Sequence, residues 1–127
     1  MELTYVSEAE KVIKNLRDEG RGRIAVTTSQ IRQILTQANM IHNRIMELEL
    51  NQDNFTVLPD EVVRMILGME VKLVYQAGRS PDVKTFIEKS KLKEQIQAVG
   101  RDKEKFKLFF AYLEALVAYH RFYGGKE

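Results

Sequence analysis

The chain has 127 residues, which is the size of one domain and is enough to bury a hydrophobic core. Hydrophobic residues make up 44% and charged residues 30%, values typical of a soluble globular protein rather than a disordered one. The absence of cysteine excludes disulfides, thiolate metal sites and cysteine nucleophiles, and it is compatible with a reducing cytoplasm. The sequence shows neither a signal peptide nor an apolar run of the roughly 20 residues that span a bilayer. We expect one soluble, cytoplasmic domain over residues 1–127, with no membrane contact.

The formal net charge is only +2, but the charges are arranged in blocks along the chain. Residues 20–46 hold four arginines and no acid, whereas residues 47–61 hold five acids and no base. Residues 62–101 hold eight bases against four acids. This distribution predicts a surface with a basic side.

The first predicted helix runs from about Thr4 to Asp18, where apolar residues recur at the spacing of one helical face. Gly20 and Gly22 end it and open a short, flexible loop that carries two arginines. The only candidate strand, in "GRIAVTT", follows this loop and is too short and unpartnered to build a sheet.

The second helix has the clearest start signal. Thr27 and Gln30 have the spacing of a capping box, and Val26 and Ile31 stand at the positions of a hydrophobic staple. We expect this helix to end between residues 47 and 50. The polar connection "NQDNFTVLPD" follows, with Phe55 and Val57 predicted to pack against the bundle.

The remaining sequence predicts three more helices. Pro59 suits the first turn of the third helix, and Gly78 its left-handed C-terminal cap. Ser80 and Pro81 fit the start of a fourth helix that Gly100 ends.

Asp102 can cap a fifth helix that reaches about Tyr123, before Gly124 and Gly125. The third and fifth helices are apolar over the widest arcs, so they are the candidates for the centre. The fold class predicted is all-α: a single compact bundle of about five helices.

The sequence offers no evident catalytic or metal site. His42 and His120 have no partner at metal-ligand spacing, and no phosphate-binding loop, dinucleotide fingerprint or nucleophile elbow occurs. We expect His120 to pack among aromatic side chains and His42 to face solvent or nucleic acid. The sequence therefore predicts no enzyme activity, no cofactor and no metal.

The basic residues are the more informative group. Two arginines lie in a loop before a helix N-terminus, where unpaired N–H groups favour an anion. Others lie on the acid-free face of the second helix, in the turn before the fourth helix, and on the fourth helix, where Lys89 and Lys93 are four residues apart. Several cations along a groove suit the phosphates of a nucleic acid. Few aromatic residues lie among them, so we expect backbone contacts without sequence reading. The predicted binding residues are Arg21, Arg23, Arg32, Arg44, Arg79, Lys84 and Lys89.

Specific strings also resemble a known family. "LTYVSEAEKVIKNL", "TTSQIR", "KLVYQAGR", "FIEKSKL" and "YLEALVAYHRFYGGKE" resemble the small subunit of the type III-A CRISPR–Cas effector, the Csm complex. The resemblance covers nearly the whole chain in order, with "NQDNFTVLPDEVV" matching least. The family pattern carries a base at the positions of Arg32, Arg79 and Lys89.

The resemblance implies a non-catalytic, all-helical subunit in antiviral defence. It would stack head to tail in several copies, beside the backbone subunits that hold the guide RNA and near the large subunit. It would stabilise the duplex of guide RNA and target RNA through sugar-phosphate contacts. Copy number, guide length, and whether the isolated chain is a monomer or a helix-exchanged dimer stay open.

Two other hypotheses stay open beside this one. The capped start "TTSQIRQIL" could belong to a helix-turn-helix DNA-binding regulator, although the spacer before it fits that geometry poorly. The wide apolar arcs could belong to an adaptor that binds only proteins.

Overall fold

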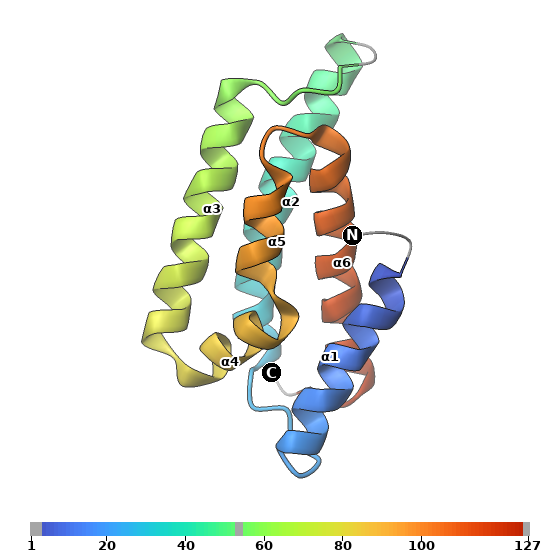
Figure 1. Cartoon of the computed structure of the whole chain (residues 1–127), viewed down its shortest axis with the longest axis vertical. Helices are drawn as coiled ribbons and strands as arrows, with labels where there is room; N and C mark the ends of the chain where they lie inside the picture. The colour runs from blue at the N-terminus through green and yellow to red at the C-terminus, as the bar shows by residue number, and fades with distance from the viewer. Residues whose placement is uncertain (1–3, 53–54, 126–127) are drawn as a thin grey trace.

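The computed structural model describes residues 4–52 and 55–125, and these residues form an all-helical bundle (Figure 1). Their only β-type pairing is an isolated antiparallel bridge between Val57 and Asp102. None of the described helices is long and apolar enough to cross a membrane. The described helices are α1 (Tyr5–Glu19), α2 (Thr28–Asn51), α3 (Asp60–Arg79), α4 (Pro81–Ser90), α5 (Leu92–Val99) and α6 (Lys103–Phe122).

The helix starts follow the capping signals in the sequence. Thr27 Oγ1 accepts from the Gln30 backbone N–H at 3.1 Å while Gln30 Oε1 accepts from the Thr27 N–H at 2.9 Å, which confirms the capping box. Ser80 and Asp102 cap α4 and α6 with their side chains, as predicted. Pro59 is the N-cap residue of α3, one position before the helix.

The predicted fourth helix is in fact two helices. Lys91 has left-handed backbone angles, φ 59° and ψ 32°, and it separates α4 from α5. A continuous helix turns about 100° per residue, which would put Leu92 on the face opposite Val83, nine residues earlier. The break turns both side chains into the core, where Val83 is 4% and Leu92 0% exposed. The prediction of about five helices was therefore one too few for the described residues.

The predicted role of Gly78 was wrong. Gly78 lies inside α3, and the helix ends only at Arg79 because Ser80 adopts an extended conformation, with φ −136° and ψ 118°. A residue before proline is disfavoured in helical geometry, and Ser80 precedes Pro81. Proline rather than glycine therefore ends α3.

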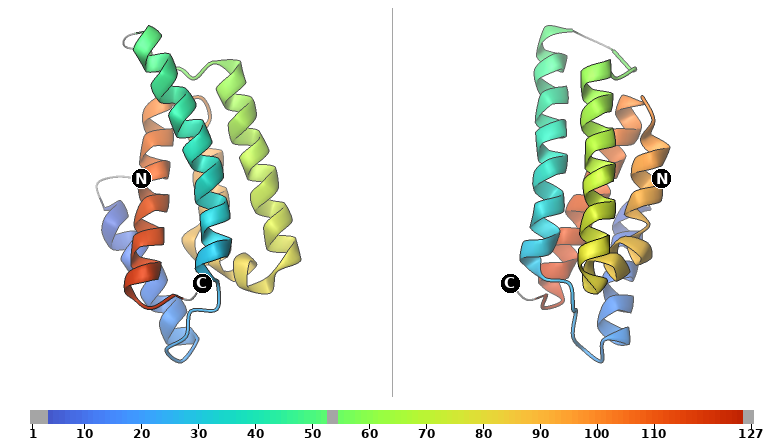
Figure 2. Two further views of the ribbon diagram at one scale, coloured as in Figure 1. Left: turned by 180° about the vertical axis from the view of Figure 1, so that it is seen from behind. Right: turned by 90° about the vertical axis from the view of Figure 1, so that its left-hand side faces the viewer.

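Helix α6 lies at the centre, as its apolar arc predicted. It packs against α1, α2 and α5, and Figure 2 shows α2 crossing one side of it while α1 lies on another. Its aromatic and aliphatic side chains fill the core beside those of α2. The buried residues of α6 are Lys103, Phe106, Phe109, Phe110, Tyr112, Leu113, Leu116 and His120.

Helix α3, the other candidate for the centre, is peripheral. One of its faces is buried through Val62, Ile66, Met69 and Leu73, but a second apolar row faces solvent. Figure 2 shows α3 standing in front of the bundle with no helix outside it. Of the two candidates for the central helix, α6 therefore takes that place and α3 does not.

The α2–α3 connection packs only in part as predicted. Phe55 is partly buried, and Lys103 Nζ lies over its ring at 4.3 Å from the centroid. Val57 is 62% exposed, so its predicted packing was wrong. Asp53 and Asn54 of this connection lie outside the described residues.

Candidate nucleic-acid interface

Six of the seven predicted binding residues come from segments that meet at one end of the bundle. This end lies at the bottom of Figure 1, and we call it the lower end. It is made of residues 18–32 and residues 76–90. It comprises the end of α1, the loop 20–27, the start of α2, the end of α3 and all of α4. The residues in it are Arg21, Arg23, Arg32, Arg79, Lys84 and Lys89.

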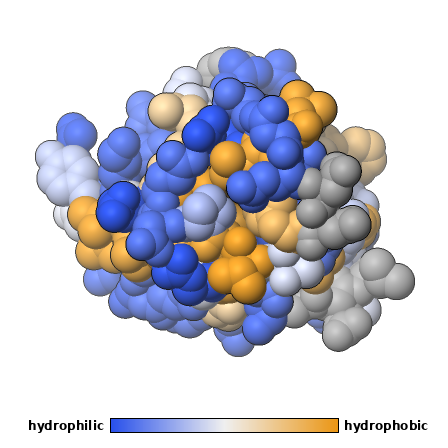
Figure 3. Space-filling view, turned by 90° about the horizontal axis from the view of Figure 1, so that it is seen from above, coloured by the Kyte–Doolittle hydropathy of each residue, from blue (hydrophilic) through white to orange (hydrophobic). Residues whose placement is uncertain are grey.

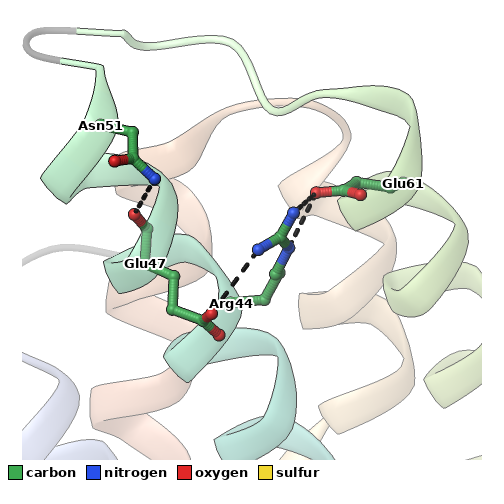
Figure 4. Close-up of polar contacts among 4 residues, drawn as sticks. All are labelled: Arg44, Glu47, Asn51 and Glu61. Carbon is green, nitrogen blue, oxygen red and sulfur yellow. Dashed lines mark hydrogen bonds and ion pairs between the residues drawn. The ribbon is translucent and has the colours of Figure 1, made fainter.

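Arg44, the seventh, lies toward the opposite end, where α2 approaches the start of α3. Its guanidinium donates to Glu61 from Nε at 2.8 Å and lies 2.7 Å from the same carboxylate through Nη2. Nη1 lies 3.6 Å from Glu47, so one guanidinium bridges two carboxylates (Figure 4). This arrangement ties α2 to α3, and it counts against Arg44 as a phosphate ligand.

Other bases at that upper end are paired as well. Arg101 Nη2 donates to Asp60 at 2.6 Å, and this hydrogen bond holds the pKa of the Asp60 carboxyl below its usual value. Lys107 and Lys103 both lie against Glu49, at 2.8 and 3.0 Å. The hydrogen bond from Lys107, followed by that from Lys103, lowers the pKa of Glu49. Arg44, Arg101, Lys103 and Lys107 are therefore all engaged with carboxylates at this end, whereas Arg64 and Lys105 are exposed.

The arginines of the loop 20–27 are presented by a tight turn. Gly22 has φ +90° and Arg21 φ 56°, and the Arg23 N–H donates to the Gly20 carbonyl at 3.1 Å. A Cβ on residue 20 would overlap the carbonyl of Arg23, so the turn requires glycine there. The loop is therefore a hydrogen-bonded turn rather than the flexible segment expected from its glycines.

Arg21, Arg23 and Arg32 are exposed, and no carboxylate of the described residues lies within ion-pair distance of them. Arg32 projects from the first turns of α2, directly after the capped start. These three side chains are the most available cations of the lower end.

Arg79 lies at a polar cleft of about 330 Å³ between α2, α3 and α4. Its guanidinium carbon lies 5.6 Å from the ring centroid of Tyr75, at the distance of a cation–π contact. Across the cleft, Gln76 Nε2 donates to Gln33 Oε1 at 3.0 Å. No acid lines this cleft; the lining residues are Gln30, Gln33, Gln76, Arg79, Ser80 and Val83.

Lys84 and Lys89 lie on different flanks of α4. Lys89 Nζ donates to Glu19 of α1 at 2.9 Å. Because both side chains are about half exposed, such a surface pair contributes about 1 kcal/mol or less and can exchange for a phosphate. Lys84 instead lines a cleft of about 310 Å³ between α3, α4 and α5, together with Lys93 and Glu88.

Lys89 and Lys93 were predicted to lie on the same helix, which was wrong, because the break at Lys91 places them on α4 and α5. Gln33 lies on the acid-free polar face predicted for the second helix, whereas Gln30 and Gln76 of the Arg79 cleft, and Tyr75 beneath Arg79, were not predicted as part of a site. Gln30 had a visible role only as a capping residue. The 46-residue separation of Gln30 and Gln76 left no local signal that they share a cleft.

Both histidines are packed against other groups of the protein. His42 is half buried and stacks on Phe110, with the ring centroids 4.2 Å apart and the planes 8° apart, so the solvated role predicted for it was wrong. His120 is 1% exposed, which confirms that it is packed, and the contact of its ring nitrogen is the carbonyl of Val26. Within residues 4–52 and 55–125, no group of three His, Cys, Asp or Glu side chains could hold a metal ion.

A second surface lies on the outer side of α3. We call it the α3 stripe: Leu67, Val71, Val74 and Tyr75, which are 55%, 67%, 51% and 63% exposed. The spacings of four, three and one residues place them along one side of the helix. Figure 3 shows hydrophobic atoms reaching the surface at the left-hand edge, the side that α3 occupies in Figure 1. Contiguous exposed apolar surface of this kind marks sites of protein contact.

Comparison with known proteins identifies the family. The family model described as "Csm2 Type III-A" matches residues 4–126. Among curated proteins named "CRISPR system Cms protein Csm2", that of Streptococcus thermophilus is 37% identical over 97% of this chain and 93% of its own. Those of Mycobacterium tuberculosis and Enterococcus italicus are 32% and 35% identical, over 97% and 93% of this chain and 94% and 84% of theirs. The chain therefore belongs to the Csm2 family, the small structural subunits of type III-A CRISPR–Cas interference complexes.

Proposed function

We propose that the lower end holds RNA inside the Csm complex by binding sugar-phosphate groups of the duplex between guide RNA and target RNA. The observation that carries this proposal is the convergence of six bases from separate segments at one end, while Arg44, Arg101, Lys103 and Lys107 of the upper end are paired with acids. Arg21, Arg23, Arg32 and Arg79 would neutralise phosphates, and Lys84 and Lys89 would extend the same surface.

The proposed contact does not read sequence. The lower end presents arginines, lysines and amide side chains, together with the exposed carboxylates of Asp18, Glu19, Asp82 and Glu88. Among the described residues, Tyr75 is the one aromatic side chain placed beside a candidate base, beneath Arg79. Base pairing between guide and target already supplies specificity in RNA-guided complexes, so the protein needs only to hold the duplex. The subunit accordingly contributes binding and no chemistry.

The α3 stripe is the candidate contact with a neighbouring protein subunit. A head-to-tail contact between copies uses two different patches and leads to an open filament, and a stripe on one side of the bundle supplies one such patch. Backbone and large subunits of the complex are the other proposed neighbours.

The helix-turn-helix regulator is the weaker alternative. In a helix-turn-helix motif, a turn of about three or four residues joins the two helices. Here the connection between α1 and α2 is longer, because it comprises the eight residues 20–27. Ile24 and Val26 of this connection are buried, at 7% and 2% exposure, so the connection packs as part of the bundle.

The test is target-RNA affinity of the assembled complex with Arg32→Ala or Arg79→Ala. We expect each change to weaken binding by up to about fivefold at physiological salt. The slope of log affinity against log salt should fall by about one for each phosphate that is no longer neutralised. Arg64→Ala is the matched control, because Arg64 is an exposed arginine near the start of α3, away from the lower end.

Equal affinity and equal salt slope for all variants would contradict the proposal and favour the adaptor. Sequence-selective binding of duplex DNA by the isolated subunit would favour the regulator. Circular dichroism confirms that each variant keeps its helices, so that a weaker affinity cannot come from unfolding.

A further inference from the structure

A buried histidine joins the end of α6 to the loop that carries Arg21 and Arg23. His120 Nε2 lies 2.7 Å from the carbonyl oxygen of Val26, across 94 residues of sequence. A carbonyl oxygen only accepts hydrogen bonds, so Nε2 carries the hydrogen and donates it. Both residues are almost fully buried, at 1% and 2% exposure. The contact therefore fixes the position of the loop just before α2 begins.

Two glycines fold the chain end back over this histidine. Gly124 has φ +88°, in the left-handed region that glycine adopts without strain. The Gly124 N–H donates to the Arg121 carbonyl at 3.1 Å, and the Gly125 N–H donates to the His120 carbonyl at 2.8 Å. Gly125 is buried, and a Cβ there would overlap the His120 ring. Only glycine at residue 125 lets the backbone close over the imidazole.

The loop 20–27 is held at both of its ends. On the side of α1, the turn at residues 20–23 is closed by its own backbone hydrogen bonds. On the side of α2, Val26 is held by His120, and the adjacent Thr27 makes the capping box with Gln30. Arg21 and Arg23 are exposed within the first of these anchors, five and three residues before Val26.

We propose that His120 and Gly125 form a latch that holds the loop 20–27 in the conformation presenting Arg21 and Arg23 to RNA phosphates. His120 and Gly125 are positioning residues and do not touch RNA. This inference rests on the proposed function of the lower end, since it assigns the latch to that binding surface.

The test compares Gly125→Ala with Gly68→Ala in the assembled complex. Gly68 lies in α3, and a Cβ there meets nothing within 4 Å, so the same chemical change is unhindered. We expect Gly125→Ala to weaken target-RNA binding by about threefold to tenfold and Gly68→Ala to leave it unchanged. In a background of Arg21→Ala with Arg23→Ala, Gly125→Ala should weaken binding no further, because the residues that the latch positions are gone.

Amide hydrogen exchange gives a readout that does not depend on RNA. Gly125→Ala and His120→Leu should speed exchange in residues 24–30 while leaving the middle of α6 protected. His120→Gln keeps an N–H that can reach the Val26 carbonyl, so it should restore most of the protection that His120→Leu removes.

The outcomes separate the two proposals. If removing both loop arginines leaves RNA affinity unchanged, their proposed binding function fails, whatever the exchange shows. If it lowers affinity but Gly125→Ala does not, the latch is wrong. The latch is also wrong if Gly125→Ala lowers affinity equally with and without the arginines, or if exchange in residues 24–30 stays at the wild-type rate.

Discussion

At the scale of the residue, the availability of a base depends on its partners more than on its place in a charge pattern. Arg32 and Arg44 lie on the same helix and in the same acid-free stretch of sequence. Arg32 has no carboxylate partner within the described part of the chain, whereas Arg44 bridges Glu47 and Glu61. Glu47 and Glu61, which pair with Arg44, come three and seventeen residues later in the sequence. The charge pattern around each arginine does not show these contacts, so both arginines were predicted to lie in one site.

His120 makes stability depend on pH. Burial lowers its pKa, and the hydrogen bond to Val26 offsets that only in part. The folded pKa therefore lies below the unfolded value of about 6.5. Below pH of about 6.5 the unfolded chain binds more protons, so this histidine contributes a loss of stability as pH falls.

We expect His120→Gln to reduce the loss of stability between pH 7.5 and 5.5, because glutamine does not titrate. Urea unfolding of both proteins at the two pH values measures this. A pH-dependent loss of the same size in the variant and the wild type would show that His120 does not cause it.

At the scale of the element, capping chemistry was the most reliable signal. Thr27, Ser80 and Asp102 each begin a helix as their spacing indicated, because a cap is a local interaction within four residues. The break at Lys91 was missed because neither glycine nor proline marks it. A signal existed nonetheless: the apolar residues before and after Lys91 fall on opposite faces of one continuous helix, and only a break can bury both sets.

The break predicts a stabilising substitution. A non-glycine residue in left-handed geometry costs roughly 1–2 kcal/mol, and glycine loses roughly 0.5–1 kcal/mol more backbone entropy on folding than alanine. Lys91→Gly should therefore raise the free energy of unfolding by about 0.5 kcal/mol. Lys84→Gly, the matched change inside α4, should lower it by about 1 kcal/mol. Denaturant unfolding checks both, and a destabilised Lys91→Gly protein would contradict the left-handed assignment.

At the scale of the whole molecule, the described structure has an upper end where Arg44, Arg101, Lys103 and Lys107 are paired with acids, a lower end with six bases and four acids, and an apolar stripe along α3. The blocks of charge in the sequence predicted a basic side, but the ion pairs of the upper end unite segments far apart in the chain. Glu49, for example, meets Lys103 and Lys107 across more than 50 residues. The α3 stripe was visible as a wide apolar arc, but whether neighbouring helices covered it depended on packing. Because α6 already fills the centre, α3 keeps one apolar side in solvent.

This arrangement predicts a substitution that separates folding from assembly. Val71 is 67% exposed, so Val71→Gln should change the free energy of unfolding by no more than about 0.5 kcal/mol. If a neighbouring subunit covers the α3 stripe, the same change should reduce the number of small subunits retained in the purified complex, because a polar amide would be buried there without a partner. Val6→Gln is the matched control, since Val6 is 43% exposed on α1, away from the stripe. Native mass spectrometry of complexes carrying each variant gives the copy number directly. Full occupancy by Val71→Gln would mean that the stripe stays in solvent after assembly, and the contacts between subunits would then have to lie on other faces of the bundle.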